Sequence, residues 1–80
     1  MGLQGQQRMQ LISLKKKYNQ ALKRYYKMVE WCETATINEQ ANHYNLIVEV
    51  INNCNNLLNE IKEIDKLVAP QEIVNGFKIF

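Results

Sequence analysis

The feature that most constrains this 80-residue chain is a stretch from residue 6 to residue 69 without Pro or Gly. Within it, apolar residues recur at alternating spacings of three and four, which is typical of helices that pack against other helices. In the first half these residues are Leu11, Leu14, Tyr18, Ala21, Tyr25, Met28, Cys32 and Ala35. In the second half they are Tyr44, Ile47, Ile51, Cys54, Leu58 and Ile61. The pattern predicts an all-α fold.

The two apolar patterns differ in phase by two residues, so one straight helix cannot turn both toward the same side. Extending the first register would bring polar residues such as Glu39 and Asn42 onto the buried side. The break between the patterns coincides with Thr36 and Glu39, which are spaced as in a capping box at the start of a helix. The chain is therefore expected to turn near residues 34–36.

We predict a first helix over about residues 4–34 and a second over about 37–68, where Pro70 ends it. The two helices form an antiparallel, coiled-coil-like hairpin over residues 1–69, and residues 70–80 form a tail. This register pairs residues whose numbers sum to about 72, for example Tyr18 with Cys54 and Met28 with Tyr44. Beyond Leu11 the facing residues become polar, so we expect the open end of the hairpin to fray or to bind something.

The tail carries a strong turn signal. Two short β-prone runs flank Asn75-Gly76, the dipeptide that favours a tight β-hairpin. We therefore predict a C-terminal β-hairpin or extended tail that docks over Leu57 and Ile64. The side chains expected to dock are Ile73, Val74, Phe77 and Phe80.

A two-helix hairpin leaves apolar residues uncovered beside its contact line. Near the turn these are Leu22, Val29, Ala41 and Val48. Because a domain normally needs a second packed layer, we interpret them as a self-interface. A second copy of the chain would complete a four-helix bundle, which predicts a homodimer.

The charge is distributed unevenly along the chain. Residues 1–34 carry seven basic and two acidic side chains, whereas residues 35–80 carry three basic and six acidic ones. The first helix therefore has a basic face, on which the candidate residues for binding nucleic acid or a partner are Lys16, Lys17, Lys23, Arg24, Lys27 and Trp31. Such a stripe can follow a phosphate backbone while aromatic residues stack on bases, but a solvated helix face has the same composition.

Catalytic and metal-binding patterns are absent from the sequence. His43 is the single histidine, and its pairing with Glu39 four residues earlier supplies two ligands where a metal site needs more. No phosphate-binding glycine loop and no nucleophile beside a base are present. We therefore predict a non-enzymatic protein without cofactor or metal. Since no segment is apolar enough for a membrane span or a signal peptide, we expect it in the cytoplasm.

Two hypotheses for function follow. In the first, the protein is a small protein–protein interaction module, homo-oligomeric, acting as adaptor, regulator or inhibitor of a larger assembly. In the alternative, it is a nucleic-acid-binding helical hairpin that uses the basic face of the first helix. The sequence does not identify the partner or the process.

Overall fold

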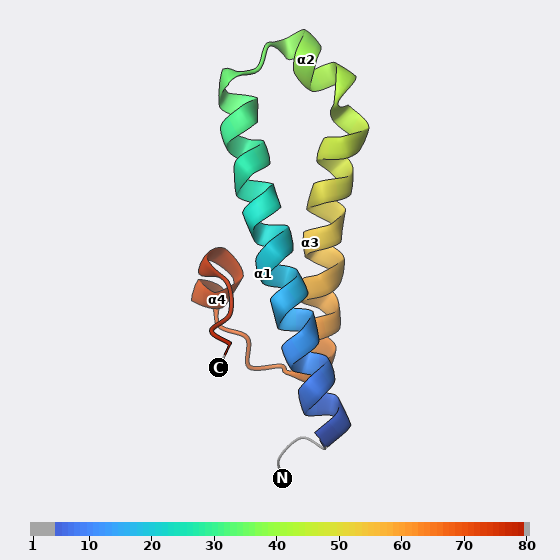
Figure 1. Ribbon diagram of the computed structural model, residues 1–80, viewed down its shortest axis with the longest axis vertical. Helices are drawn as coiled ribbons and strands as arrows, with labels where there is room; N and C mark the ends of the chain where they lie inside the picture. Colours follow the sequence, from blue (N-terminus) through green and yellow to red (C-terminus); the bar gives the residue numbers. More distant parts are fainter. Residues whose placement is uncertain (1–4, 80) are drawn as a thin grey trace.

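The computed structural model describes residues 5–79 of the chain and contains four helices over that range. They are α1 (Gly5–Thr34), α2 (Ile37–Asn42), α3 (Tyr44–Ile64) and α4 (Pro70–Asn75). Helices α1 and α3 run antiparallel, α2 spans the turn between them, and α4 returns to lie beside α1 (Figure 1). The predicted all-α hairpin is confirmed.

The turn is fixed by side chains that cap both neighbouring helices. The Thr36 hydroxyl accepts a hydrogen bond from the backbone N–H of Glu39 at 3.1 Å and donates one to the Glu39 carboxylate at 3.1 Å. The side-chain amide of Gln40 donates to the carbonyls of Cys32 at 2.9 Å and Ala35 at 3.2 Å. These carbonyls lie at the end of α1, where helical partners run out. The predicted turn near residues 34–36 is therefore held from both sides.

The second predicted helix, over about residues 37–68, is interrupted at its start. His43 separates α2 from α3, with φ of −106° and ψ of 13°. Its backbone N–H lies 3.2 Å from the carbonyls of both Glu39 and Gln40, so one donor is shared between two acceptors. Regular bonding resumes with the N–H of Ile47 donating to the carbonyl of His43 at 3.0 Å. The interruption changes the direction of the chain within the turn.

The second predicted helix also ends earlier than expected, at Ile64 rather than near residue 68. Asp65 has an extended backbone, and its carboxylate accepts a hydrogen bond from the N–H of Leu67 at 3.0 Å. A short acidic side chain that bonds the backbone two residues on stabilises a turn at the expense of a helix. The same carboxylate lies 3.7 Å from the Lys15 ammonium of α1.

The face of α3 that packs on α1 differs from the predicted one by a rotation of part of a turn. Val50 is 9% exposed, whereas Ile51, which we expected opposite Ala21, is 37% exposed. The inward residues of α3 follow spacings of four and three, as two-helix packing requires. They are Val50, Cys54, Leu57, Ile61 and Ile64, and Leu58 of the predicted face also packs against the core. Val50, Leu57 and Ile64 lie outside the predicted apolar pattern of this helix and still form part of the contact.

Residues 5–10, where we expected fraying or binding, are helical and exposed. Packing is tightest next to them, in the half of the hairpin toward its open end. Ile61 is fully buried there, together with Leu11, Leu14 and Tyr18 of α1. Toward the turn the ribbons of α1 and α3 diverge (Figure 1), and Tyr44, expected opposite Met28, is 64% exposed. The predicted layer of Met28 with Tyr44 is therefore wrong. The tail adds a third layer against the middle of α1, where Tyr18, Asn19 and Tyr26 bond to its backbone, and contributes no residue to the lining near the turn.

The predicted β-hairpin is wrong, because residues 5–79 contain no strand and the tail begins with α4. Pro70 occupies the first turn of this helix, where its missing N–H costs nothing. The Glu72 carboxylate accepts from the backbone N–H of Ala69 at 3.0 Å. Gly76 ends the helix with φ of 92° and donates its N–H to the Glu72 carbonyl at 2.9 Å. Asn75-Gly76 thus serves as a helix end.

Side chains of α1 hold the tail in place through its backbone. The Tyr18 hydroxyl donates to the carbonyl of Ile73 at 2.6 Å, and the Tyr26 hydroxyl donates to that of Val74 at 2.6 Å. The buried Phe77 ring packs edge-on against Tyr18, with centroids 5.5 Å apart. We expected the tail over Leu57 and Ile64 of α3, but these hydrogen bonds fix it to α1.

Candidate interaction surface

A groove with an apolar floor lies between α1 and α3 in the half of the molecule near the turn. Its volume is about 410 Å³. We call it the basic groove, and its lining consists of Arg24, Lys27, Met28 and Trp31 of α1, His43 at the start of α3, and Leu46, Ile47 and Val50 of α3. This volume is within the range of small-molecule and side-chain pockets. The groove exists because the two helices diverge before α2 connects them.

Trp31 and His43 form the end of the basic groove that lies nearest the turn. Their rings pack edge-on with centroids 5.0 Å apart and an interplanar angle of 67°. The Nδ1 atom of His43 lies 2.9 Å from the carbonyl oxygen of Glu39, a distance that suits donation from an Nδ1–H tautomer. The interruption between α2 and α3 therefore places an aromatic pair at the groove instead of a metal site.

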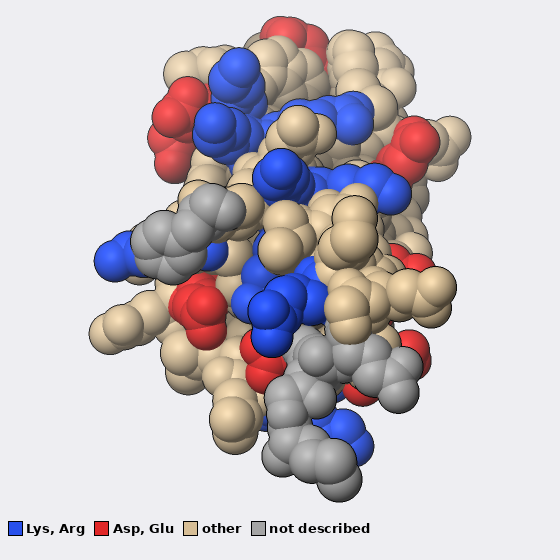
Figure 2. All heavy atoms as spheres, turned by 60° about the horizontal axis from the view of Figure 1, so that its bottom comes forward, with Lys and Arg blue, Asp and Glu red and all other residues tan. Residues whose placement is uncertain are grey.

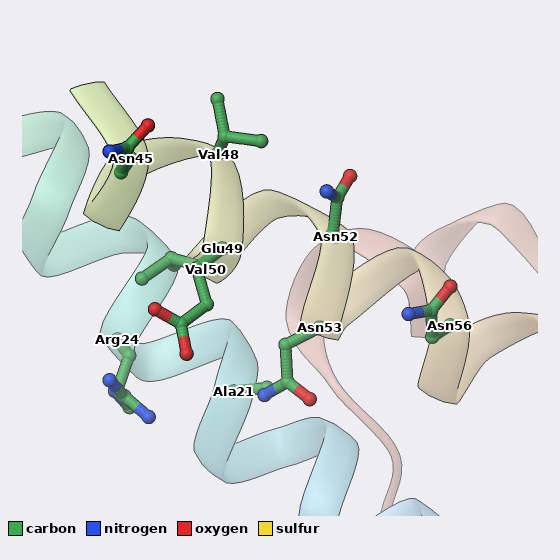
Figure 3. A pocket seen from close by; sticks show the side chains of 9 residues that line it. All are labelled: Ala21, Arg24, Asn45, Val48, Glu49, Val50, Asn52, Asn53 and Asn56. Carbon is green, nitrogen blue, oxygen red and sulfur yellow. The ribbon is translucent and has the colours of Figure 1, made fainter.

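A second hollow adjoins the basic groove and shares Arg24 and Val50 with it. Its volume is about 640 Å³, and its other lining residues are Ala21, Asn45, Val48, Glu49, Asn52, Asn53 and Asn56. Figure 3 shows Glu49 and Asn53 directed from α3 toward α1, whereas Val48 and Asn52 point away. This asparagine-lined hollow is open and polar, so its side chains are well solvated without a ligand. This hollow extends the basic groove, and its lining offers hydrogen-bonding groups next to the apolar floor of the groove.

The basic residues singled out in the sequence are exposed on α1. Lys16, Lys17, Lys23, Arg24 and Lys27 are all exposed, and Trp31 is half-buried. Lys and Arg side chains gather in a band across the face shown in Figure 2. Within residues 5–79, the ion pair of Lys15 with Asp65 is the one that brings opposite charges within 4.0 Å. Two of the predicted cations, Arg24 and Lys27, line the basic groove together with Trp31.

The structure separates the four residues predicted as a self-interface. Leu22 is 8% exposed and packs in the core beneath the tail, close to Gly76. Val29 and Val48 are half-buried, and Ala41 is exposed on α2. Figure 3 shows Val48 pointing away from α1. Leu22 is thus covered within one chain, while the other three lie near the turn without forming one continuous patch with it.

The four tail residues also have different environments. Phe77 is buried, Ile73 is half-buried and Val74 is 57% exposed. Phe80 lies outside the described residues. Together with α1 and α3, Ile73 and Val74 line a third hollow of about 320 Å³, which includes Tyr26 and Ile51. The tail therefore leaves an apolar edge beside the hairpin.

Two titratable groups in the core are shifted in the direction that burial dictates. Burial raises the pKa of the Tyr18 phenol, and the neighbouring Cys54 and Tyr26 add to that rise. Burial also raises the pKa of the Cys54 thiol, while the positive charge of Arg24 opposes the shift. A protonated, buried thiol is a poor nucleophile. Both groups therefore contribute to packing in the form they have at neutral pH.

Residues 5–79 contain no group of three or more His, Cys, Asp or Glu side chains placed to hold a metal ion. Over the same range, none of the helices combines the length and apolar character that a membrane span requires. No protein-family model matches the chain, and comparisons with curated proteins and with solved structures found no similar protein.

Sequence reasoning missed the apolar floor of the basic groove. Met28 and Ile47 were assigned to the closed contact between the helices, and Leu46 was given no role. Leu46 is 50% exposed although it is a large apolar residue. The sequence does contain one signal for this floor. Leu46, Ile47 and Val50 give the helix two adjacent apolar faces, whereas a helix that packs against one partner needs only one.

Proposed function

We propose that the protein is a small non-enzymatic protein–protein interaction module, an adaptor, regulator or inhibitor of a larger assembly. The observation that supports this proposal is the uncovered apolar lining of the basic groove, at the end of the hairpin that has no third layer. Large exposed apolar residues next to a groove mark interaction sites on soluble domains. Leu46 and Tyr44 are of this kind, since both are at least half exposed.

Affinity capture from the native host, with bound proteins identified by mass spectrometry, tests this function. The wild-type chain is compared with Leu46→Glu, which places a charge in the groove, and with Leu67→Glu as a matched control. Leu67 is 90% exposed in the segment between α3 and α4. A partner captured by the wild type and the control, but lost with Leu46→Glu, is the expected result. The function is rejected if no protein is captured and the purified chain is monomeric.

We also propose that the module is a homodimer, with the half near the turn supplying the self-interface. Exposed Ala41 and half-buried Val29 and Val48 support this part of the proposal, whereas Leu22 is covered by the tail. A second copy would supply the layer that α1 and α3 lack near the turn.

Nucleic-acid binding is the second candidate, and the exposed cations of α1 favour it. Lys16, Lys23 and Lys27 have no acidic partner within 4.0 Å in the described part of the chain. A phosphate backbone would neutralise them, with affinity that falls steeply as salt rises. A gel shift at about 50 mM salt, repeated with Lys23→Glu/Lys27→Glu, tests this candidate. Absence of a shift with the wild type excludes it.

A further inference from the structure

We propose that the basic groove binds an acidic amphipathic helix of another protein, an inference that rests on the proposed interaction function. Such a helix carries apolar residues on one face and Asp or Glu beside them. The basic groove matches both parts, because its floor is apolar and the charges in its lining are positive.

The floor is suited to insertion of leucine-sized side chains. Met28, Leu46, Ile47 and Val50 line a space of about 410 Å³ that the chain itself leaves unfilled. Met28 is flexible and unbranched, so it can adapt its shape to a ligand. Burial of apolar side chains in such a groove is the main driving force when a helix binds between two others.

The charges in the lining select the sign of the partner. Arg24 and Lys27 are exposed and lie on the α1 side of the groove, and no Asp or Glu is among the lining residues. Neither cation has an acidic side chain within 4.0 Å in residues 5–79. Arginine can bind a carboxylate through two parallel hydrogen bonds. An acidic flank on the partner would therefore meet two available cations, while a basic flank would be repelled.

The groove also has the dimensions of a short helix. From Arg24 to Trp31 the α1 wall covers eight residues, a rise of about 10 Å, which is roughly two helical turns. A partner helix of two to three turns would insert apolar residues at spacings of three and four. The asparagine-lined hollow continues from Arg24 and Val50, and its asparagines can form hydrogen bonds with the end of such a helix. Its one carboxylate, Glu49, is not among the residues that line the basic groove.

A nucleic acid fits this groove less well than an acidic helix does. It would satisfy Arg24 and Lys27 but leave Met28, Leu46 and Ile47 without an apolar partner. A phosphate backbone needs a row of cations, and the lining contains two. The apolar floor decides in favour of a protein ligand.

Trp31 allows the groove to be observed directly, because it is the single tryptophan of the chain. The probes are two tryptophan-free synthetic helical peptides with the same leucine pattern, one flanked by Glu and the other by Lys. Each is titrated into the full chain while Trp31 fluorescence is followed. We expect the Glu peptide to shift the emission to shorter wavelength and to bind at least about tenfold more tightly than the Lys peptide.

Charge-reversal variants distinguish binding in the basic groove from non-specific electrostatic attraction between peptide and protein. Arg24→Glu/Lys27→Glu should weaken binding of the Glu peptide by about tenfold or more and improve binding of the Lys peptide. The control Lys62→Glu/Lys66→Glu changes the net charge equally at exposed positions outside the groove and should leave both affinities within about twofold. Circular dichroism of each variant verifies that the helices are intact.

Several outcomes would overturn the assignment. These are equal affinity for both peptides, no response of Trp31 to the Glu peptide, or equal losses in the groove and control variants. Tighter binding of a single-stranded oligonucleotide than of the Glu peptide would show that the groove is a nucleic-acid site. A concentration-dependent Trp31 shift without peptide would assign it to a second copy. A partner captured from the host that is insensitive to Arg24→Glu/Lys27→Glu would overturn this inference while leaving the proposed function intact.

Discussion

The side-chain amide of Asn19 holds both backbone groups of Phe77. Its Oδ1 accepts from the Phe77 N–H at 2.7 Å, and its Nδ2 donates to the Phe77 carbonyl at 2.8 Å. This two-point contact joins residues 58 positions apart and fixes the tail where the Phe77 ring enters the core. Asn19, in the middle of α1, thus fixes the position of the C-terminal tail, which the helical pattern of the sequence does not predict.

Asn19→Ala should therefore loosen the tail. Removing the amide leaves the partly buried N–H and carbonyl of Phe77 without partners, which costs about 1–3 kcal/mol of unfolding free energy. Urea unfolding followed by circular dichroism measures this loss. Asn59→Ala is the matched control, since Asn59 is exposed on α3, and its better helix propensity should stabilise the protein by up to about 0.7 kcal/mol. Equal stability of the two variants would show that the amide does not hold the tail.

Gly76→Ala should destabilise the same contact from the opposite side. Gly76 has φ of 92°, and a Cβ atom there would lie 2.8 Å from Asn19 Oδ1. The strained backbone and the displaced amide together should cost about 1–3 kcal/mol, measured by thermal or urea unfolding. Gly5→Ala is the control, because nothing lies within 4 Å of its Cβ position in α1. A Gly76→Ala protein as stable as the control would contradict the observed position of the tail.

The stability of the fold should decline in alkaline solution through Tyr18. Burial raises the pKa of this phenol above its ordinary value of 10.0. The unfolded chain then loses this proton at a lower pH than the folded chain does. The contribution of Tyr18 to the free energy of unfolding is therefore complete below about pH 10 and is lost as pH rises through the pKa of the folded state. The raised pKa of Cys54 acts in the same direction from about pH 9.

Tyr18→Phe separates this effect from general alkaline unfolding. The variant loses the hydrogen bond to Ile73, so it should be less stable at pH 8, yet its stability should fall less between pH 9 and pH 11. Urea unfolding at several pH values provides the measurement. Tyr44→Phe serves as the control, since Tyr44 is 64% exposed, and it should retain the wild-type pH dependence. Identical slopes for wild type and Tyr18→Phe would exclude Tyr18 as the titrating group.

The hairpin could be predicted from sequence because its signals are local. The spacing of Leu11, Leu14 and Tyr18 defines the buried face of α1, and the Thr36–Glu39 cap marks the turn. The buried face of α3 could not be fixed in the same way. Val50 and Ile51 are adjacent and both apolar, so two rotations of the helix satisfy the pattern nearly equally. Contact with α1 selects the rotation that buries Val50.

The tail and the groove were harder to predict, for different reasons. Asn75-Gly76 suits a hairpin turn and a helix end, and only Pro70 and Glu72 upstream favour the helix. The groove depends on the divergence of α1 and α3 toward the turn, which is a property of tertiary packing and has no local signal in the sequence. The charge pattern of the sequence indicated Arg24 and Lys27, which line the groove. The sequence does not show that the apolar floor between α1 and α3 remains unfilled.

Self-association through the half near the turn gives the final prediction. Val29→Glu/Val48→Glu should reduce the mass measured by light scattering from that of a dimer to that of a monomer, because two charges per chain would be buried in the interface. Leu67→Glu, which adds a charge at a 90% exposed site, should leave the mass unchanged. A wild-type chain that is already monomeric, or a double variant that remains dimeric, would remove Val29 and Val48 from the interface. The second result would direct attention to the apolar edge formed by Val74, Tyr26 and Ile51, which also lies open on this molecule.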